Sequence, residues 1–85
     1  MYKVFITNKA EKQLDRLDKA DARDISKKIL ELDFPFASNF DIQKMVDPQK
    51  MYRLRVGKAR IIMKISDAEK RIYIVKIGYR GAVYG

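Results

Sequence analysis

The sequence has 85 residues, 47% of them hydrophobic, which is enough for one small domain with a genuine core. It carries 19 basic and 11 acidic side chains, a formal net charge of +8, and contains neither cysteine nor histidine. The missing residue types exclude disulfides, cysteine-ligated zinc and nucleophilic sites that use a histidine base. We therefore expect a single domain over residues 1–85.

The N-terminal residues do not indicate a secreted or membrane protein. No run approaches the roughly 18 apolar residues that a membrane-spanning helix needs. The opening residues MYKVFITNKA lack the apolar centre and the small-residue cleavage site of a signal peptide. We therefore expect a cytoplasmic protein without membrane contact.

Residues 2–18 predict a strand followed by a helix. The segment YKVFIT at 2–7 is short and rich in β-branched and aromatic residues, as strands are. Thr7 or Asn8 then caps a helix that ends near Asp18. A second helix follows, with Asp21 as its N-cap or as an acid in its first turn, and with an apolar stripe at helical spacing on Ala22, Ile25, Ile29 and Leu32. The two form a helical hairpin that packs on a sheet.

The segment from 33 to 49 loses all periodicity. Two prolines and scattered phenylalanines predict an ordered loop, with Phe34, Phe36 and Phe40 as plugs of the core.

The next segment, MYRLRVGKARIIMK at 51–64, predicts a β-hairpin. Apolar residues alternate with Arg53 and Arg55, the pattern of a half-buried strand. Gly57 and Lys58 form a two-residue turn of type II′, and the return strand covers 59–66. This register places Arg55 opposite Arg60. Because like charges facing each other destabilise a sheet, the cluster predicts an acidic partner or a bound anion.

A last strand at 72–78 is almost continuously apolar, which is typical of a central strand. The fold class is therefore α+β, in the order β-α-α-β-β-β, with an antiparallel sheet and helices on one face. The opposite face, which carries the arginines, stays open.

The positive charge is concentrated in the second half of the chain. Residues 1–47 carry nine basic and nine acidic side chains, whereas residues 48–85 carry ten basic and two acidic ones. A one-sided basic surface is typical of proteins that bind a polyanion, and the alternative is a solvated face that only aids solubility. The candidate phosphate-binding and stacking residues lie in this half: Lys50, Arg53, Arg55, Lys58, Arg60, Lys64, Tyr73, Tyr79 and Tyr84.

RNA cleavage without a metal or other cofactor fits this residue set. The 2′-hydroxyl of RNA is an internal nucleophile, so arginines need only position the phosphate and stabilise the charge that develops on it. Tyr84 is a candidate for protonating the leaving 5′-oxygen or for acting as a base. The basic half has no clustered carboxylates of the kind that a metal-dependent nuclease uses.

The whole chain resembles the RelE/ParE superfamily of type II toxin–antitoxin toxins. The resemblance rests on the element order, on YRLRVGKARIIMKI, and on the terminal segment VKIGYRGAVY. It implies a toxin of the RelE type, a ribosome-dependent endoribonuclease that cuts mRNA in the A site and so inhibits translation. The catalytic residues that it implies are Arg53, Arg55, Arg60, Arg80 and Tyr84.

The resemblance also implies partners and leaves alternatives open. The partners are the ribosome with its mRNA and a small RelB-like antitoxin, acidic in its toxin-binding segment, through which alone promoter DNA is bound. Arg53 and Arg55 stand where RelE toxins usually have lysines. One alternative is a ParE-type toxin that inhibits gyrase and cleaves nothing, although ParE branches tend to lack the full set of cations and tyrosine. The other is a catalytically silent module that binds RNA or the antitoxin.

Overall fold

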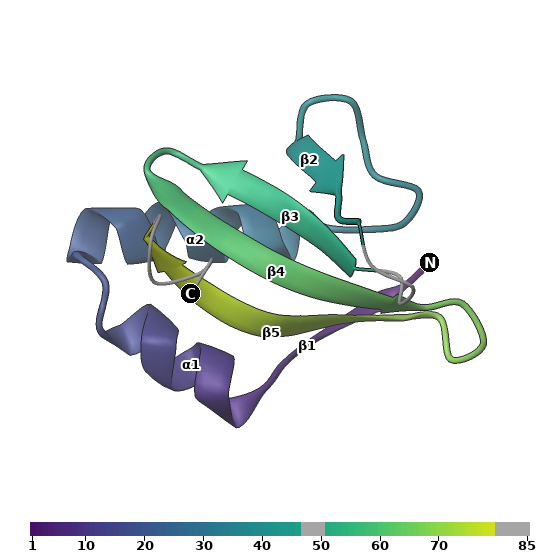
Figure 1. Ribbon diagram of the computed structural model, residues 1–85, viewed down its shortest axis with the longest axis horizontal. Coiled ribbons are helices and arrows are strands. Elements are labelled where there is room, and N and C mark those ends of the chain that lie inside the picture. Colours follow the sequence, from purple (N-terminus) through teal and green to yellow (C-terminus); the bar gives the residue numbers. More distant parts are fainter. Residues whose placement is uncertain (47–50, 80–85) are drawn as a thin grey trace.

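The computed structural model describes residues 1–46 and 51–79. Two helices and five strands follow each other in the order β1 (Lys3–Ile6), α1 (Asn8–Asp15), α2 (Lys19–Leu30), β2 (Asp41–Lys44), β3 (Met51–Val56), β4 (Ala59–Ser66) and β5 (Arg71–Tyr79). The strands form one sheet in the order β1-β5-β4-β3-β2, and both helices lie on the same side of it (Figure 1). The predicted α+β class, with its helical hairpin packed on one face, is confirmed.

The path of the chain explains why the sheet is mixed. After β1 the chain crosses through α1 and α2 to the far edge, where β2 begins (Figure 1). From there β2, β3, β4 and β5 pair antiparallel in succession and return to β1, which pairs with β5 in parallel. The prediction of a purely antiparallel sheet therefore misses one parallel pair at the β1 edge.

Strand β2 lies inside the segment that the sequence predicted to be a loop. It is a four-residue edge strand, and of its residues Asp41, Ile42, Gln43 and Lys44 only Ile42 is apolar and packs against the core. A single apolar residue cannot produce an alternating pattern, so the strand becomes visible only through its pairing with β3.

The helix boundaries follow from local capping. Thr7 precedes α1, and its hydroxyl accepts a hydrogen bond from the Ala10 N–H, as predicted. The helix ends earlier than predicted because the N–H groups of Arg16 and Leu17 bond back three residues, to Gln13 and Leu14, in a tightened last turn. Helix α2 then starts at Lys19 and has Asp21 as the acid of its first turn.

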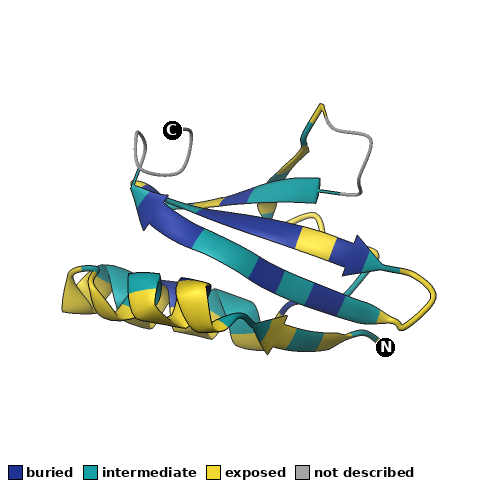
Figure 2. Cartoon of the chain, turned by 60° about the horizontal axis from the view of Figure 1, so that its bottom comes forward, coloured by how far each residue is buried: buried dark blue, intermediate teal, exposed yellow. Residues whose placement is uncertain are grey.

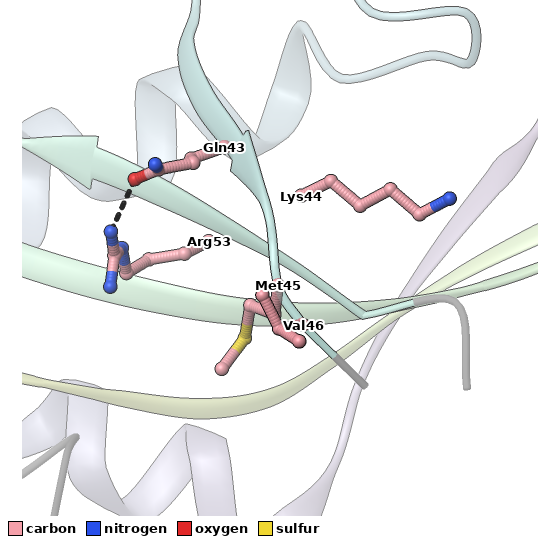
Figure 3. A pocket seen from close by; sticks show the side chains of 5 residues that line it. All are labelled: Gln43, Lys44, Met45, Val46 and Arg53. Atoms are coloured by element: carbon pink, nitrogen blue, oxygen red, sulfur yellow. Dashed lines mark hydrogen bonds between the residues drawn. The ribbon is translucent and has the colours of Figure 1, made fainter. Parts of the chain in front are cut away.

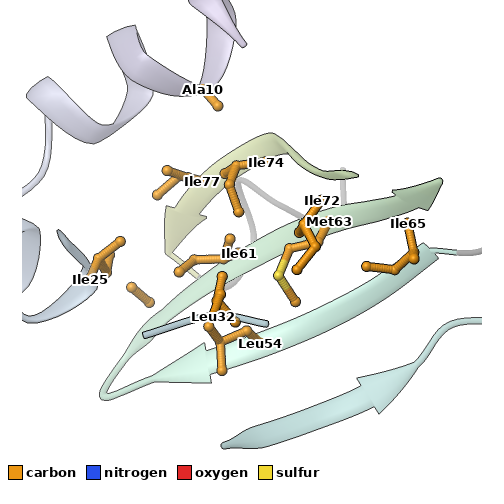
Figure 4. Packing of buried hydrophobic residues seen from close by; sticks show 11 residues of the cluster. Ala10, Ile25, Leu32, Leu54, Ile61, Met63, Ile65, Ile72, Ile74 and Ile77 are labelled. Carbon is orange, nitrogen blue, oxygen red and sulfur yellow. The ribbon is translucent and has the colours of Figure 1, made fainter. Parts of the chain in front are cut away.

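The core lies between the helices and the sheet (Figure 4). Its fully buried centre is Ile61 and Met63 of β4, with Ile72 and Ile74 of β5 and Ile25 of α2. The remaining buried members of the cluster are Ala10, Leu32, Leu54, Ala59, Ile65 and Ile77. The three phenylalanines of the 33–49 segment are partly buried and pack against this cluster, as predicted, and so does Tyr52.

Strand β5 contains a β-bulge that changes which residues face the helices. Ile62 pairs with Lys76 but Met63 pairs with Ile74, so Val75 is an extra residue in the strand. Before the bulge Ile72 and Ile74 point into the core, and after it Ile77 does. A regular strand would have turned Lys76 toward the core. The bulge therefore keeps the lysine on the other face.

Candidate nucleic-acid interface

The face of the sheet that the helices leave uncovered is called the open face below. On the hairpin, the residues that alternate with the core residues lie on this face. On the neighbouring strands, the residues paired with them lie on the same face. Its residues are Lys3 and Phe5 of β1, Asp41 and Gln43 of β2, Met51, Arg53 and Arg55 of β3, Arg60, Ile62, Lys64 and Ser66 of β4, and Arg71, Tyr73, Lys76 and Gly78 of β5.

The hairpin has the predicted geometry at its turn. Gly57 has φ of +59°, and Lys58 has no positive φ, which fits type II′ and not the type I′ turn, where both residues are left-handed. The two-residue turn fixes the register, and Arg55 is paired with Arg60 as predicted. Arg53 lies two residues from Arg55 on the same face, opposite Ile62.

Strand β2 supplies polar partners to the first two arginines. Asp41 is paired in register with Arg55, and its Oδ2 lies 2.7 Å from the Arg55 Nε. Gln43 is paired with Arg53 and accepts a hydrogen bond from its guanidinium through Oε1. The acidic partner expected from the facing arginines is thus provided partly by the chain itself. Both members of the Arg55–Asp41 pair remain more than half exposed, so a phosphate can compete for the guanidinium.

Arg60 turns back over the hairpin turn. Its Nη1 donates to the backbone carbonyl of Ala59 at 3.1 Å and reaches that of Gly57 at 3.5 Å. Its neighbour across β5 is Gly78, which has no side chain to occupy the adjacent position on the open face. Carbonyl oxygens do not neutralise a guanidinium, so Arg60 keeps its positive charge available for an anion.

A shallow hollow opens beside Arg53 at the outer edge of the sheet (Figure 3). It has a volume of about 240 Å³ and is lined by Gln43, Lys44, Met45, Val46 and Arg53. The Gln43 and Arg53 side chains meet across β2 and β3, whereas Lys44 points away from them (Figure 3). The hollow therefore presents one hydrogen-bonded guanidinium and apolar wall atoms.

Two of the predicted RNA-binding residues lie on the helix side of the sheet. The Tyr79 hydroxyl donates to Asp21 Oδ2 at 2.7 Å and accepts from the Asp18 N–H at 3.2 Å. The Lys58 ammonium lies 5.2 Å from the centre of the Tyr79 ring, and 3.6 Å and 3.9 Å from the Asp18 and Asp21 carboxylates. The structure does not bring Tyr79 and Lys58 together with the arginines.

The environment of Tyr79 also changes its acidity. Its hydrogen bond to the Asp21 carboxylate, together with partial burial and the nearby acids, raises the pKa of the phenol above its usual value. The phenol therefore stays protonated at neutral pH and does not serve as a base.

The remaining predicted residues divide into two groups. Lys64 is on the open face and exposed. Lys50, Arg80 and Tyr84 lie outside the described residues. Lys76 belongs to the open face as well, next to Ile62, and was missed because the apolar run around it gave no sign of the bulge.

The described residues offer neither a cluster of metal ligands nor a membrane-spanning helix. Residues 1–46 and 51–79 contain no group of three or more His, Cys, Asp or Glu side chains that could hold a metal ion. Neither helix in this part of the chain has the length and apolar character needed to cross a membrane.

Comparison of the sequence with known families gives one match. The family model described as the ParE toxin of the type II toxin–antitoxin system parDE matches residues 4–84. No curated protein matches the sequence at a significant level.

The structure is similar to several solved toxin structures. An archaeal RelE–RelB complex from Pyrococcus horikoshii contains a chain that is 31% identical, with a TM-score of 0.72 over 94% of this chain and 96% of that one. The corresponding chain of a RelB–RelE antitoxin–toxin complex from Methanococcus jannaschii is 21% identical, with a TM-score of 0.78 over 94% of both chains. The isolated RelE toxin of E. coli is 19% identical, with a TM-score of 0.76 over 99% and 92%.

Proposed function

Because this chain belongs to the RelE/ParE superfamily of type II toxins, we propose that it is a ribosome-dependent endoribonuclease that binds mRNA on its open face. In this proposal it cleaves mRNA in the A site and thereby stops translation. The matching family model and the 31% identical RelE chain carry the assignment to the superfamily. The ribosome-dependent reaction is inferred from the resemblance to RelE toxins together with the arginines of the open face.

One observation carries the proposal. The hairpin holds Arg53, Arg55 and Arg60 on one face of a rigid sheet, with Arg55 and Arg60 directly opposite each other. Since like charges in that arrangement are unfavourable in an empty sheet, their presence fits a surface whose ligand is an anion. A guanidinium donates two parallel hydrogen bonds to a phosphate and stays charged at every cellular pH.

The chemistry that these residues support is transfer within the RNA itself. The 2′-oxygen attacks the neighbouring phosphorus, the bond to the 5′-oxygen breaks, and a 2′,3′-cyclic phosphate and a 5′-hydroxyl result. One proton leaves the 2′-hydroxyl and one is added to the 5′-oxygen. The attack places extra negative charge on the phosphoryl oxygens, and arginines already fixed in position stabilise that charge.

The proton transfers need other groups. An arginine with a pKa above about 12 is not a proton acceptor, so Arg53, Arg55 and Arg60 bind and stabilise only. Tyr84 is proposed for protonation of the 5′-oxygen or for the base role, and Arg80 for a further phosphate contact, as the family resemblance implies. Tyr79, which directly precedes Arg80, pairs with Ala59, the neighbour of Arg60.

We propose a cognate antitoxin as the protein partner. The toxins of Pyrococcus horikoshii and Methanococcus jannaschii that this chain is similar to were solved in complex with RelB antitoxins. An acidic antitoxin segment that covered the open face would compete with RNA for the same guanidiniums.

A second function is favoured by the description of the matching family, which is that of ParE toxins. In that case the chain would inhibit gyrase through protein contact and cleave no RNA. The internal partners Asp41 and Gln43, which engage two of the three arginines, are consistent with a surface that performs no phosphate chemistry.

Primer extension on a defined mRNA in a purified translation system tests the proposal. Wild-type protein should produce cuts confined to codons in the ribosomal A site, and Arg80→Ala and Tyr84→Phe should weaken them. Lys27→Ala, which removes one exposed charge from α2 on the other side of the molecule, is the matched control and should cut like wild type.

The other outcomes distinguish the alternatives. Intact mRNA together with growth arrest and inhibited gyrase supercoiling would replace the nuclease with a ParE-type function. Intact mRNA with normal growth would leave a module that binds RNA or the antitoxin without catalysis.

A further inference from the structure

The open face carries a second group of residues at the end away from the hairpin turn. Phe5 of β1 is paired with Tyr73 of β5, and their ring centres are 5.9 Å apart with planes inclined by 30°. The Arg71 guanidinium lies 4.7 Å from the centre of the Phe5 ring. We call Phe5, Arg71 and Tyr73 the aromatic patch.

The position of Phe5 sets it apart from the other apolar residues of its strand. In β1 the side chains of Val4 and Ile6 pack against the core, whereas Phe5 points to the open face and is 39% exposed. Figure 2 shows the same alternation of exposed and half-buried residues along this strand. Part of the Phe5 ring is therefore accessible to a ligand on the same face of the sheet as the arginines.

Hydrogen bonds hold the patch in one geometry. Arg71 Nη1 donates to the Tyr73 hydroxyl at 3.2 Å, and that hydroxyl donates to Glu69 Oε1 at 3.0 Å. The Glu69 Oε2 lies 3.8 Å from Arg71 Nη1, so the carboxylate is engaged within the patch. The rings and the guanidinium plane are therefore arranged before any ligand arrives, which lowers the entropy lost on binding.

Positive charges surround the two rings. Lys3 is the register partner of Arg71, and Lys64 is the register partner of Tyr73. Lys64 lies on the same strand and face as Arg60, four residues away, a distance of about 13 Å at the usual rise of a strand. The cations of the aromatic patch and those of the hairpin thus lie on the same face of the sheet.

We infer that the aromatic patch is a stacking site for an unpaired base of single-stranded RNA. Bases stack on aromatic rings and on guanidinium planes, and the flanking lysines contact the neighbouring phosphates. Stacking tolerates any base because every base has a π-face, so the patch adds affinity without sequence preference. This inference rests on the proposed function, in which RNA binds the open face at the arginines.

Fluorescence anisotropy with a short, labelled, 2′-O-methylated RNA tests the site, because this probe has no free 2′-hydroxyl and cannot be cleaved. Phe5→Leu removes the ring and keeps an apolar side chain, and we expect it to weaken binding by at least about fivefold. Phe5→Tyr keeps the ring and should bind within about twofold of wild type.

Salt dependence separates stacking from phosphate contact. Phe5→Leu should leave the slope of log affinity against log salt unchanged, whereas Arg60→Ala should reduce it by about 0.7, one phosphate contact to a single strand. In wild-type protein, addition of the RNA should also shift the ring proton resonances of Phe5 and Tyr73, a readout that requires no variant to fold.

Three results would overturn the inference. The first is wild-type RNA affinity in Phe5→Leu, and the second is an equal loss of RNA affinity in Phe5→Leu and Phe5→Tyr. The third is a Phe5→Leu protein that loses binding to an antitoxin but keeps its RNA affinity. Cleavage on the ribosome is measured separately. Cleavage that is insensitive to Phe5→Leu, with unchanged RNA binding, rejects the stacking site and leaves the proposed function standing. RNA binding that depends on the Phe5 ring, without any cleavage on the ribosome, would support the stacking site and reject the proposed endoribonuclease function.

Discussion

The two faces of β4 differ although they alternate residue by residue, with the apolar and buried Ile62 as the one open-face residue between Arg60 and Lys64. Ile61 and Met63 point toward the helices and are fully buried, while Arg60 and Lys64 point to the open face and reach solvent. One strand thus supplies both the centre of the core and the centre of the candidate site. The buried residues that alternate with the arginines pack in the core and hold the sheet rigid. The arginines therefore need not contribute to the stability of the fold.

Substitution on the covered face should have the largest effect on folding. We expect Ile61→Ala to lower the free energy of unfolding by about 2–5 kcal/mol, because it removes fully buried methyl groups and leaves a cavity. Lys64→Ala on the open face should change it by less than about 0.5 kcal/mol. Urea denaturation measures both, and a comparable loss in Lys64→Ala would break the division between the faces.

Substitution at the hairpin on the open face should affect activity and spare folding. Removing one preorganised donor to a developing oxyanion typically slows a reaction by about 10²–10³-fold, and we expect Arg60→Ala to reduce ribosomal mRNA cleavage to that extent. Single-turnover cleavage measures the rate, and circular dichroism checks the fold. If Arg60→Ala cleaves at the wild-type rate, Arg60 does not act in the reaction.

Removing the internal acid of the open face should have a smaller effect in the opposite direction. Asp41→Asn takes away the carboxylate 2.7 Å from Arg55 and leaves the guanidinium for a phosphate. We expect RNA affinity to rise by about two- to fivefold at low salt and the gain to shrink as salt screens the exposed pair. Asp24→Asn, an exposed acid of α2, is the matched control for net charge. An equal gain in that control would mean that overall charge, and not the Arg55 contact, is responsible.

The smallest effect is expected for Tyr79→Phe, which should change the thermal stability of the protein only slightly. The pKa of Tyr79 is raised in the folded protein, so its stabilising contribution is complete below the unfolded value of about 10 and is lost as the pH rises through the folded value. The Tm difference between wild type and Tyr79→Phe should therefore be largest near neutral pH and should shrink at alkaline pH. Thermal melts from pH 7 to 11 measure it, and a difference independent of pH would contradict the contact with Asp21.

The parts of the molecule that depend on local pattern were predictable from the sequence. The alternation around Arg53 and Arg55, the glycine of the turn and the cap at Thr7 each act within a few residues, and the structure has all of them. The opposition of Arg55 and Arg60 followed from the same local rule, because turn length fixes register.

The parts that depend on distant pairing were not predictable. Strand β2 and its Asp41 gain their role only from lying beside β3, which no short segment encodes. The orientation of Tyr79 depends on the bulge four residues earlier, which sets the phase of the rest of β5. The catalytic roles of Arg80 and Tyr84, and the RNA contact of Lys50, stay predictions because these residues lie outside the described part of the chain.

The bulge at Val75 has a consequence for the comparison of this protein with its relatives. Where a relative has a regular strand in place of the bulge, a residue-by-residue match along β5 would exchange the two faces beyond Val75. Lys76 would then be aligned with a core position, and a surface lysine would be scored as a substitution in the interior. With such a relative, the open-face residues of β5 can be compared only after a gap is placed at Val75.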